Sequence, residues 1–293
     1  MEKKVTVKDV AREAGVSVAT VSYIMNNRTD QKISAETRKK VLQIANLLNY
    51  RPSHAAISLA TGKTNVIGVA YYLNPDTPAR NIEINTFVNM LIERLNRMKY
   101  DILFMPVNED EDTIATNRNI YAIIAIDLTH EQFKNLSEKH FVPIINVDML
   151  VKDDLFYQIY TDYPSLINEA TELIGEECYI VVDKFANENF RTFITEHIPS
   201  ERVVIMSAFS YEPLKKLTGK KVIVVGSYLA LMIQPYLKDT DMVVIASEEN
   251  QRMLPQTIKT IHNDISKKAN LTINILLNAL NRNFDLNHDC KVR

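Results

Sequence analysis

Residues 6–27 read TVKDVAREAGVSVATVSYIMNN, and this stretch decides how the first part of the chain folds. Thr6, followed by Asp9, is a helix-start signal because side-chain oxygens can accept N–H groups of the first turn. Gly15 then predicts a left-handed turn that ends the helix. Between these signals, apolar side chains recur at helical spacing and predict one buried face: Val7, Val10, Ala11 and Ala14.

A second and a third helix follow from the same kind of pattern. Ser17 can cap a helix that carries Val18, Val21 and Met25 on one side, and two short helices joined by a glycine turn form a helix-turn-helix. The third helix is expected to begin near Ser34, with a buried stripe of Val41, Ile44, Ala45 and Leu48. Periodicity alone leaves two interpretations open, a DNA-binding unit and a plain helical bundle.

The charge is distributed unevenly. Through Thr64 the sequence holds 11 Lys and Arg against 5 Asp and Glu, a net charge of +6. The whole chain has 34 and 36, so the remainder carries 23 against 31, or −8. A basic segment joined to an acidic body is expected of a protein whose one end meets phosphate, although a solvated basic face would look the same.

Residues 6–27, together with ISAETRKKVLQIANLLNYRPSHAAISLATG (33–62), resemble the DNA-binding headpiece and hinge of the lactose/galactose-repressor family. The resemblance implies a duplex DNA operator as partner, a homodimer, and a hinge that folds on DNA. It divides the chain into a helix-turn-helix headpiece (1–52), a hinge helix and linker (53–64), and a two-lobed effector-binding and dimerisation domain (65–293).

The resemblance also assigns DNA contacts. In the recognition helix and headpiece these are Ser17, Val18, Ala19, Thr20, Ser22, Tyr23, Asn26, Ser34 and Thr37. Val18 and Ala19 cannot hydrogen-bond a base edge but can pack on a thymine methyl, and Tyr23 offers one hydroxyl. The remaining hydroxyl and amide side chains suit phosphates, which set the register of the protein on the duplex.

The hinge contacts implied by the resemblance are Ser53, Ala56, Ile57 and Leu59. Pro52 blocks continuation of the third helix, and the short helix after it is too short to be stable alone in water. Leu59 matches the family's lever leucine, which unstacks a base step from the minor groove. An ordinary linker leucine is the alternative. Ile57 departs from the family, which has a polar or basic residue there.

The sequence gives little support for nucleotide binding, metal binding or catalysis. Gly62-Lys63-Thr64 ends like a phosphate-binding loop, but Ile57 stands where the signature needs a second glycine. The 6 histidines are scattered and the 2 cysteines form no CxxC pair, so we expect no metal, no cofactor, no disulfide and no enzyme. The N-terminus lacks the apolar core of a signal peptide, and no apolar run approaches the ~18 residues of a membrane span. We therefore expect a cytoplasmic protein with no membrane partner.

After the hinge, apolar β-rich runs alternate with helical patterns. The runs are 66–71, 102–107, 121–126, 143–147, 178–182, 203–206, 221–225 and 242–246. Helical stripes occupy Phe87–Leu95 and Ala269–Leu280. Such alternation predicts parallel sheets, and the resemblance specifies an α/β body with two lobes of the periplasmic-binding-protein type after an all-α headpiece.

The resemblance is weakest at the cleft between the lobes. It implies effector contacts from Asp148, Asp162 and Arg191, although both aspartates could simply cap neighbouring turns. Met149 replaces a family arginine, and Gly226-Ser227 replaces Asn-Asp. Three interpretations therefore stay open: a small sugar-like or nucleobase effector, a different ligand or protein co-regulator, and a degenerate cleft in a constitutive DNA binder.

We expect a homodimeric transcriptional regulator, a repressor of carbohydrate-related genes, that binds a palindromic operator under allosteric control by a small effector. Two rivals from other classes are a sensor protein with a vestigial headpiece and a cytosolic sugar-modifying enzyme.

Overall fold

The computed structural model describes residues 5–25, 32–48, 50, 65–107, 120–206, 212–281 and 289–293. The chain separates into two compact units, Met1–Thr64 and Asn65–Arg293. Within the described residues, no helix combines the length and the apolar character that crossing a membrane requires.

The described residues of the first unit form three short helices, α1 (Val7–Ala14), α2 (Val18–Met25) and α3 (Ala35–Leu47). Val10, Val21 and Val41, one from each helix, are fully buried and form the centre of the core. The predicted stripe of the first helix is confirmed by the burial of its alanines, but in α2 it is Ile24 and not Val18 that joins Val21 in the core. The predicted turn is also confirmed, because Gly15 has a φ of +67°.

The first lobe of the second unit is built on a parallel sheet with the strand order β11-β5-β4-β3-β1-β2. Its strands are β1 (Val66–Tyr71), β2 (Asp101–Pro106), β3 (Ile120–Ile126), β4 (Ile144–Val147), β5 (Tyr157–Thr161) and β11 (Asp289–Val292). Alternate residues of these strands face opposite sides. One side packs against α5 (Pro78–Arg97) and α11 (Ile265–Leu280), and the other against α6 (His130–Lys139).

The second lobe has a parallel sheet with the order β10-β9-β8-β6-β7. Its strands are β6 (Tyr179–Asp183), β7 (Val203–Met206), β8 (Val222–Val225), β9 (Met242–Ala246) and β10 (Lys259–His262). Its helices are α7 (Tyr163–Ile174), α8 (Glu188–Thr195), α9 (Ser227–Ile233) and α10 (Glu248–Gln251), with 3₁₀ turns at 200–202, 212–217, 234–236 and 239–241.

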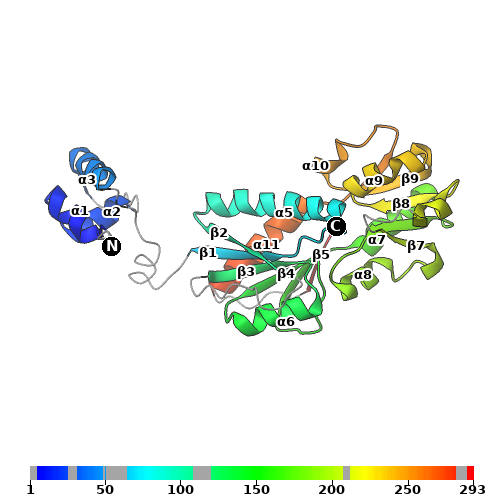
Figure 1. Cartoon of the computed structure of the whole chain (residues 1–293), viewed down its shortest axis with the longest axis horizontal. Coiled ribbons are helices and arrows are strands. Elements are labelled where there is room, and N and C mark those ends of the chain that lie inside the picture. The colour runs from blue at the N-terminus through cyan, green and yellow to red at the C-terminus, as the bar shows by residue number, and fades with distance from the viewer. Residues whose placement is uncertain are drawn as a thin grey trace. The chain divides into compact units, whose positions relative to one another are not determined.

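The second unit therefore has two α/β lobes, each with helices on both faces of its sheet (Figure 1). The predicted fold class, an all-α headpiece followed by a two-lobed α/β body with parallel sheets, is confirmed. The first turn of α5 lies at the junction of the lobes, since Ala79 is buried in the core of the second lobe while the rest of the helix covers the first. This position brings the residues of that turn into the region where the effector cleft was expected.

Candidate nucleic-acid interface and inter-lobe site

The N-termini of α2 and α3 are capped in the same way. The Ser17 hydroxyl accepts the Thr20 N–H at 3.0 Å, and the Ser34 hydroxyl accepts the Thr37 N–H at 3.1 Å. In each pair the two hydroxyls are also hydrogen-bonded to each other, at 2.9 and 2.8 Å. A helix N-terminus is electropositive and presents unbonded N–H groups, so both ends are suited to bind phosphate.

The exposed edge of α2 carries the predicted base-reading residues. Val18 is 41 % exposed and Ala19 is exposed, whereas Val21 and Ile24 are turned into the core. The remaining predicted contacts lie at the surface to varying degrees: Ser17 and Ser34 are exposed, and Thr20, Ser22, Tyr23 and Thr37 are half-buried. Asn26 and the hinge residues Ser53, Ala56, Ile57 and Leu59 lie outside the described residues.

A second candidate site lies where the two lobes meet, and its centre is Arg80 on the first turn of α5. The Arg80 side chain is buried, and its Nε–H donates to Asp127 Oδ2 at 2.9 Å. Its Nη2 lies 3.6 Å from Asp148 Oδ2, and the guanidinium carbon lies 4.1 Å from the centroid of the Phe185 ring. Sequence reasoning did not find Arg80, although a basic residue in the first turn of a helix opposes the helix dipole and is a signal in itself.

The two carboxylates that face Arg80 are positioned by the same local backbone conformation. Asp127 follows β3 and Asp148 follows β4, and each adds one more N–H bond to the neighbouring strand, to the carbonyls of Val147 and Ile159. Both then take a φ of +48°, a left-handed conformation that aspartate tolerates better than most residues. The turn directs both side chains across the carboxyl edge of the sheet, where ligands bind in such folds.

Asp148 has a second cationic partner, Lys268 of α11. Lys268 Nζ lies 2.9 and 2.8 Å from the two carboxylate oxygens and also donates to the Thr161 hydroxyl at 3.0 Å. Burial would raise the pKa of Asp148, but Lys268 and Arg80 outweigh it, and the pKa lies below its usual value. Asp148 is therefore ionised and already engaged by side chains of the protein.

Polar contacts join the lobes around this centre. Asn187, the N-cap of α8, donates its N–H to Asp127 Oδ1 at 3.0 Å and its amide to the Leu128 carbonyl at 3.1 Å. The Asn187 amide oxygen in turn accepts the Leu150 N–H at 3.0 Å. Each of these bonds connects the second lobe to the first, so the described structure is an arrangement in which the lobes are in contact.

Glu83, one turn after Arg80 on α5, also joins the two lobes through hydrogen bonds. It accepts the Ser227 N–H at 3.2 Å and the Asn250 side-chain amide at 3.3 Å, both from the second lobe. Gly226 has a φ of +108°, and a β-carbon there would lie 3.5 Å from Glu83 Oε1. The Gly226-Ser227 sequence, which departs from the family pattern, thus accommodates a carboxylate from the opposite lobe.

The buried charges at the junction are unbalanced. Two cations, Arg80 and Lys268, meet four carboxylates, those of Asp127, Asp148, Asp183 and Glu83. The pKa of Asp183 is raised to about 6, because burial and the nearby Glu83 raise it by more than Arg80 lowers it. Burial also raises the pKa of Glu83, against the influence of Arg80. The acidic excess favours cations over neutral molecules at this site.

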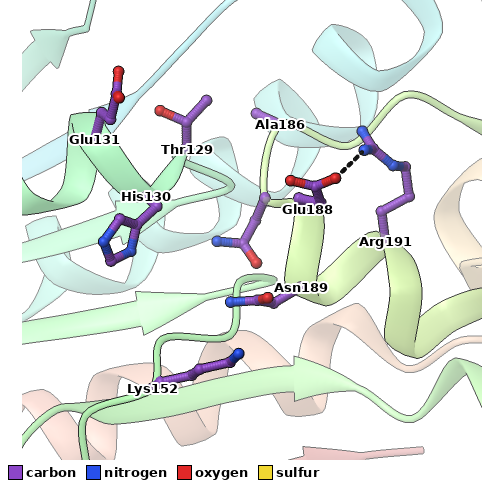
Figure 2. Close-up of a pocket in the computed structure, with 9 residues that line it drawn as sticks. Thr129, His130, Glu131, Lys152, Ala186, Glu188, Asn189 and Arg191 are labelled. Carbon is purple, nitrogen blue, oxygen red and sulfur yellow. Dashed lines mark ion pairs between the residues drawn. The ribbon is translucent and has the colours of Figure 1, made fainter.

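A cavity of about 540 Å³ lies beside this junction, between the starts of α6 and α8. Its walls are Thr129, His130, Glu131, Lys152, Ala186, Asn187, Glu188, Asn189 and Arg191. Figure 2 shows Arg191 turned toward Glu188, with which it forms an ion pair at 3.6 Å. Of the three predicted effector contacts, Arg191 lines this cavity, Asp148 lies in the charged cluster, and Asp162 accepts the Ser165 hydroxyl at the start of α7.

Comparison with protein families places the first unit. Residues 6–53 match the model described as bacterial regulatory proteins, lacI family. Among curated proteins, catabolite control protein A of Staphylococcus epidermidis is 30% identical over 211 residues, which are 66% of this chain and 62% of that protein. Its counterpart from Staphylococcus xylosus is 33% identical over 180 residues, 59% of this chain and 53% of that protein. The chain thus matches somewhat under two thirds of the length of these relatives.

Solved structures extend the likeness of fold to the whole chain. The lac repressor dimer bound to operator and the anti-inducer ONPF has a TM-score of 0.69 at 19% identity, covering 99% of this chain and 96% of that one. A complex of the transcriptional regulator CelR with cellobiose has a TM-score of 0.61 at 12% identity, covering 98% and 97%. These relatives and structures are regulators by name, and none is named as an enzyme.

Proposed function

We propose that this chain belongs to the LacI family of bacterial regulatory proteins and is a transcriptional regulator that binds duplex DNA. The observation that carries the proposal is the three-helix unit that matches the family model, with an exposed edge on α2 and two capped helix N-termini. A helix of this size fits the major groove, and the net charge of +6 through Thr64 suits a phosphate backbone.

The contacts divide into two kinds. Val18 and Ala19 read bases through thymine methyl groups, and Tyr23 contributes a hydroxyl. The Ser17–Thr20 and Ser34–Thr37 caps hold phosphates, which sets register without reading sequence. Ser22 and Asn26 belong to the same phosphate-facing group, and Ser53, Ala56, Ile57 and Leu59 are assigned to the hinge on sequence alone.

The regulator acts as a homodimer on a palindromic operator, as a repressor of carbohydrate-related genes. Two observations support this: catabolite control protein A is the name of the matched relatives, and the lac repressor of similar fold is a dimer on its operator. Two-fold symmetry of the protein corresponds to two-fold symmetry of the site, with half-sites spaced by the dimer.

For the body there are two candidate roles. In the first, a small effector enters the cavity beside Arg191 and shifts the lobes, by binding one lobe arrangement more tightly than the other. In the second, the regulator needs no small effector, or takes a protein co-regulator. The second is favoured by Asp148, which already pairs with Arg80 and with Lys268 at the junction where the resemblance implies an effector.

The test is selection of bound sequences from a random pool of duplexes by the full chain, with and without sugars and phosphorylated metabolites. The proposal predicts an enriched palindrome. An effector that changes the yield would support the first role of the body, and a palindrome insensitive to every compound would support the second. The absence of any enriched sequence would overturn the proposal of DNA binding.

A further inference from the structure

We propose that Arg80 is a built-in ligand: its guanidinium fills a cation-selective site between the lobes and holds them together without a small molecule. This rests on the proposed function only for its consequence, which is a body that supports DNA binding in the absence of an effector. The lobe contacts themselves are independent of any DNA.

The surroundings of the guanidinium are those of a bound cation. Asp127 accepts one hydrogen bond at 2.9 Å, Asp148 lies at 3.6 Å, and the Phe185 ring stacks at 4.1 Å. Carboxylates together with an aromatic face are the recognition elements that select a guanidinium or an ammonium group. Phe185 belongs to the second lobe and the two aspartates to the first, so Arg80 bridges them.

The segment of α5 that carries Arg80 also bridges the lobes. Ala79, the preceding residue, is buried in the core of the second lobe, while the later turns of α5 pack on the first. Asp127 accepts the Asn187 N–H with its other oxygen, so one carboxylate binds both the guanidinium and the second lobe. Loss of Arg80 would leave the buried Asp127 carboxylate without its cationic partner.

The fit of the tethered guanidinium is incomplete, which identifies the class of molecule that could replace it. Arg80 Nη2 is buried and has no hydrogen-bond partner, because α5 holds the side chain in a position where it reaches Asp127 but not Asp148 closely. A free guanidinium has no such restraint and can orient its donors toward both carboxylates. Since four carboxylates meet two cations here, the site would accept a guanidinium or amine in preference to a neutral sugar.

The experiment compares Arg80→Ala with the wild type and with Arg94→Ala in the full chain. Arg94 is a matched control, because it lies on the same helix and binds Ser266 of α11 within one lobe, at 3.1 and 2.6 Å. The measurements are the thermal midpoint of the body, its radius of gyration by solution scattering, and operator affinity, each with millimolar guanidinium chloride or equal sodium chloride.

We expect Arg80→Ala to lower the midpoint by roughly 10 °C, since a buried ion pair loses one partner. We also expect it to enlarge the radius of gyration and weaken operator binding. Guanidinium, but not sodium, would restore all three, and neither salt would restore Arg94→Ala. An Arg80→Ala protein with unchanged scattering, or one that guanidinium fails to restore, would overturn the proposal.

If Arg80→Ala fails to fold, Phe185→Leu provides the second variant, because it removes the stacking and keeps every charge. We expect it to enlarge the radius of gyration in the same direction, and unchanged scattering would overturn the proposal. Failure of the proposed function would be seen separately. In that case the wild-type chain would select no DNA, while the radius of gyration and the thermal midpoint would still differ between Arg80→Ala and the wild type.

Discussion

Substitution of Asp183 by Asn should change how the stability of the body depends on pH. Asp183 ends β6, and its carboxyl interacts electrostatically with Arg80, Glu83 and Asp127. Burial raises its pKa from the usual 3.8 to about 6. The folded protein therefore holds a proton on this carboxyl at pH values where the unfolded chain has released it.

The sign and the size follow from this difference. Because the folded state binds more protons between pH 4 and 6, the contribution of Asp183 to stability is fully present below pH 3.8 and is lost as pH rises through about 6. The difference in pKa corresponds to at most about 3 kcal/mol in the free energy of unfolding. Asn is the uncharged isostere, so the stability gain of Asp183→Asn over wild type should grow by about 1 to 3 kcal/mol between pH 4.5 and 7.5.

The assay is urea unfolding of both proteins across this pH range, with the difference between them as the quantity of interest. The difference removes the contribution of every carboxyl that does not interact with Asp183, and the remaining contribution comes from Asp183 with its neighbours Glu83 and Asp127. Glu138→Gln is the control, because Glu138 is 62% exposed and forms only a 4.0 Å surface pair with Lys134. A gap between Asp183→Asn and wild type that stays constant from pH 4.5 to 7.5 would refute the reasoning.

Two further predictions concern single positions. Gly226→Ala should lower the free energy of unfolding of the body by about 1 to 3 kcal/mol, because a φ of +108° strains any side chain and Glu83 lies close. Gly219→Ala is the control and should lower it less, because a β-carbon there meets nothing within 4 Å. Equal losses for the two variants in urea unfolding would count against this account. Ser34→Ala should destabilise the three-helix unit by about 1 kcal/mol through loss of the Thr37 cap, measured by thermal unfolding, and an unchanged midpoint would show that the cap contributes nothing.

Most of the architecture could be predicted because the decisive signals are local. The caps at Ser17 and Ser34 and the turn at Gly15 are each set within four residues, and the eight apolar runs of the body all correspond to strands. The strands that were not predicted are β5, β10 and β11. The sequence of β5 contains polar residues and so does not look like a buried strand, yet all of it is buried. The polar side chains can be buried because Gln158 accepts the Val151 N–H and the Thr161 hydroxyl accepts a hydrogen bond from Lys268.

The inter-lobe site could be predicted only in part. Asp148 was expected at the cleft from the family resemblance, and it does lie at the junction, whereas its role there depends on cations from α5 and α11. Arg80 and Asp127 are 47 residues apart in sequence, and no local pattern links them. Their pairing follows from the sheet order, which brings the ends of β3 and β4 to the start of α5.

The most direct test of the central claim is the affinity of Ala19→Asp for the selected operator. Ala19 is exposed in the first turn of α2, where an acidic side chain favours the helix, so the fold should be retained or slightly stabilised. If this edge of α2 enters the groove, the new carboxylate faces bases and phosphates, and specific binding should fall by at least about a hundredfold. Gln43→Asp, which adds the same charge to an exposed position of α3, should bind nearly as the wild type does. A stable Ala19→Asp protein with wild-type affinity would contradict the account.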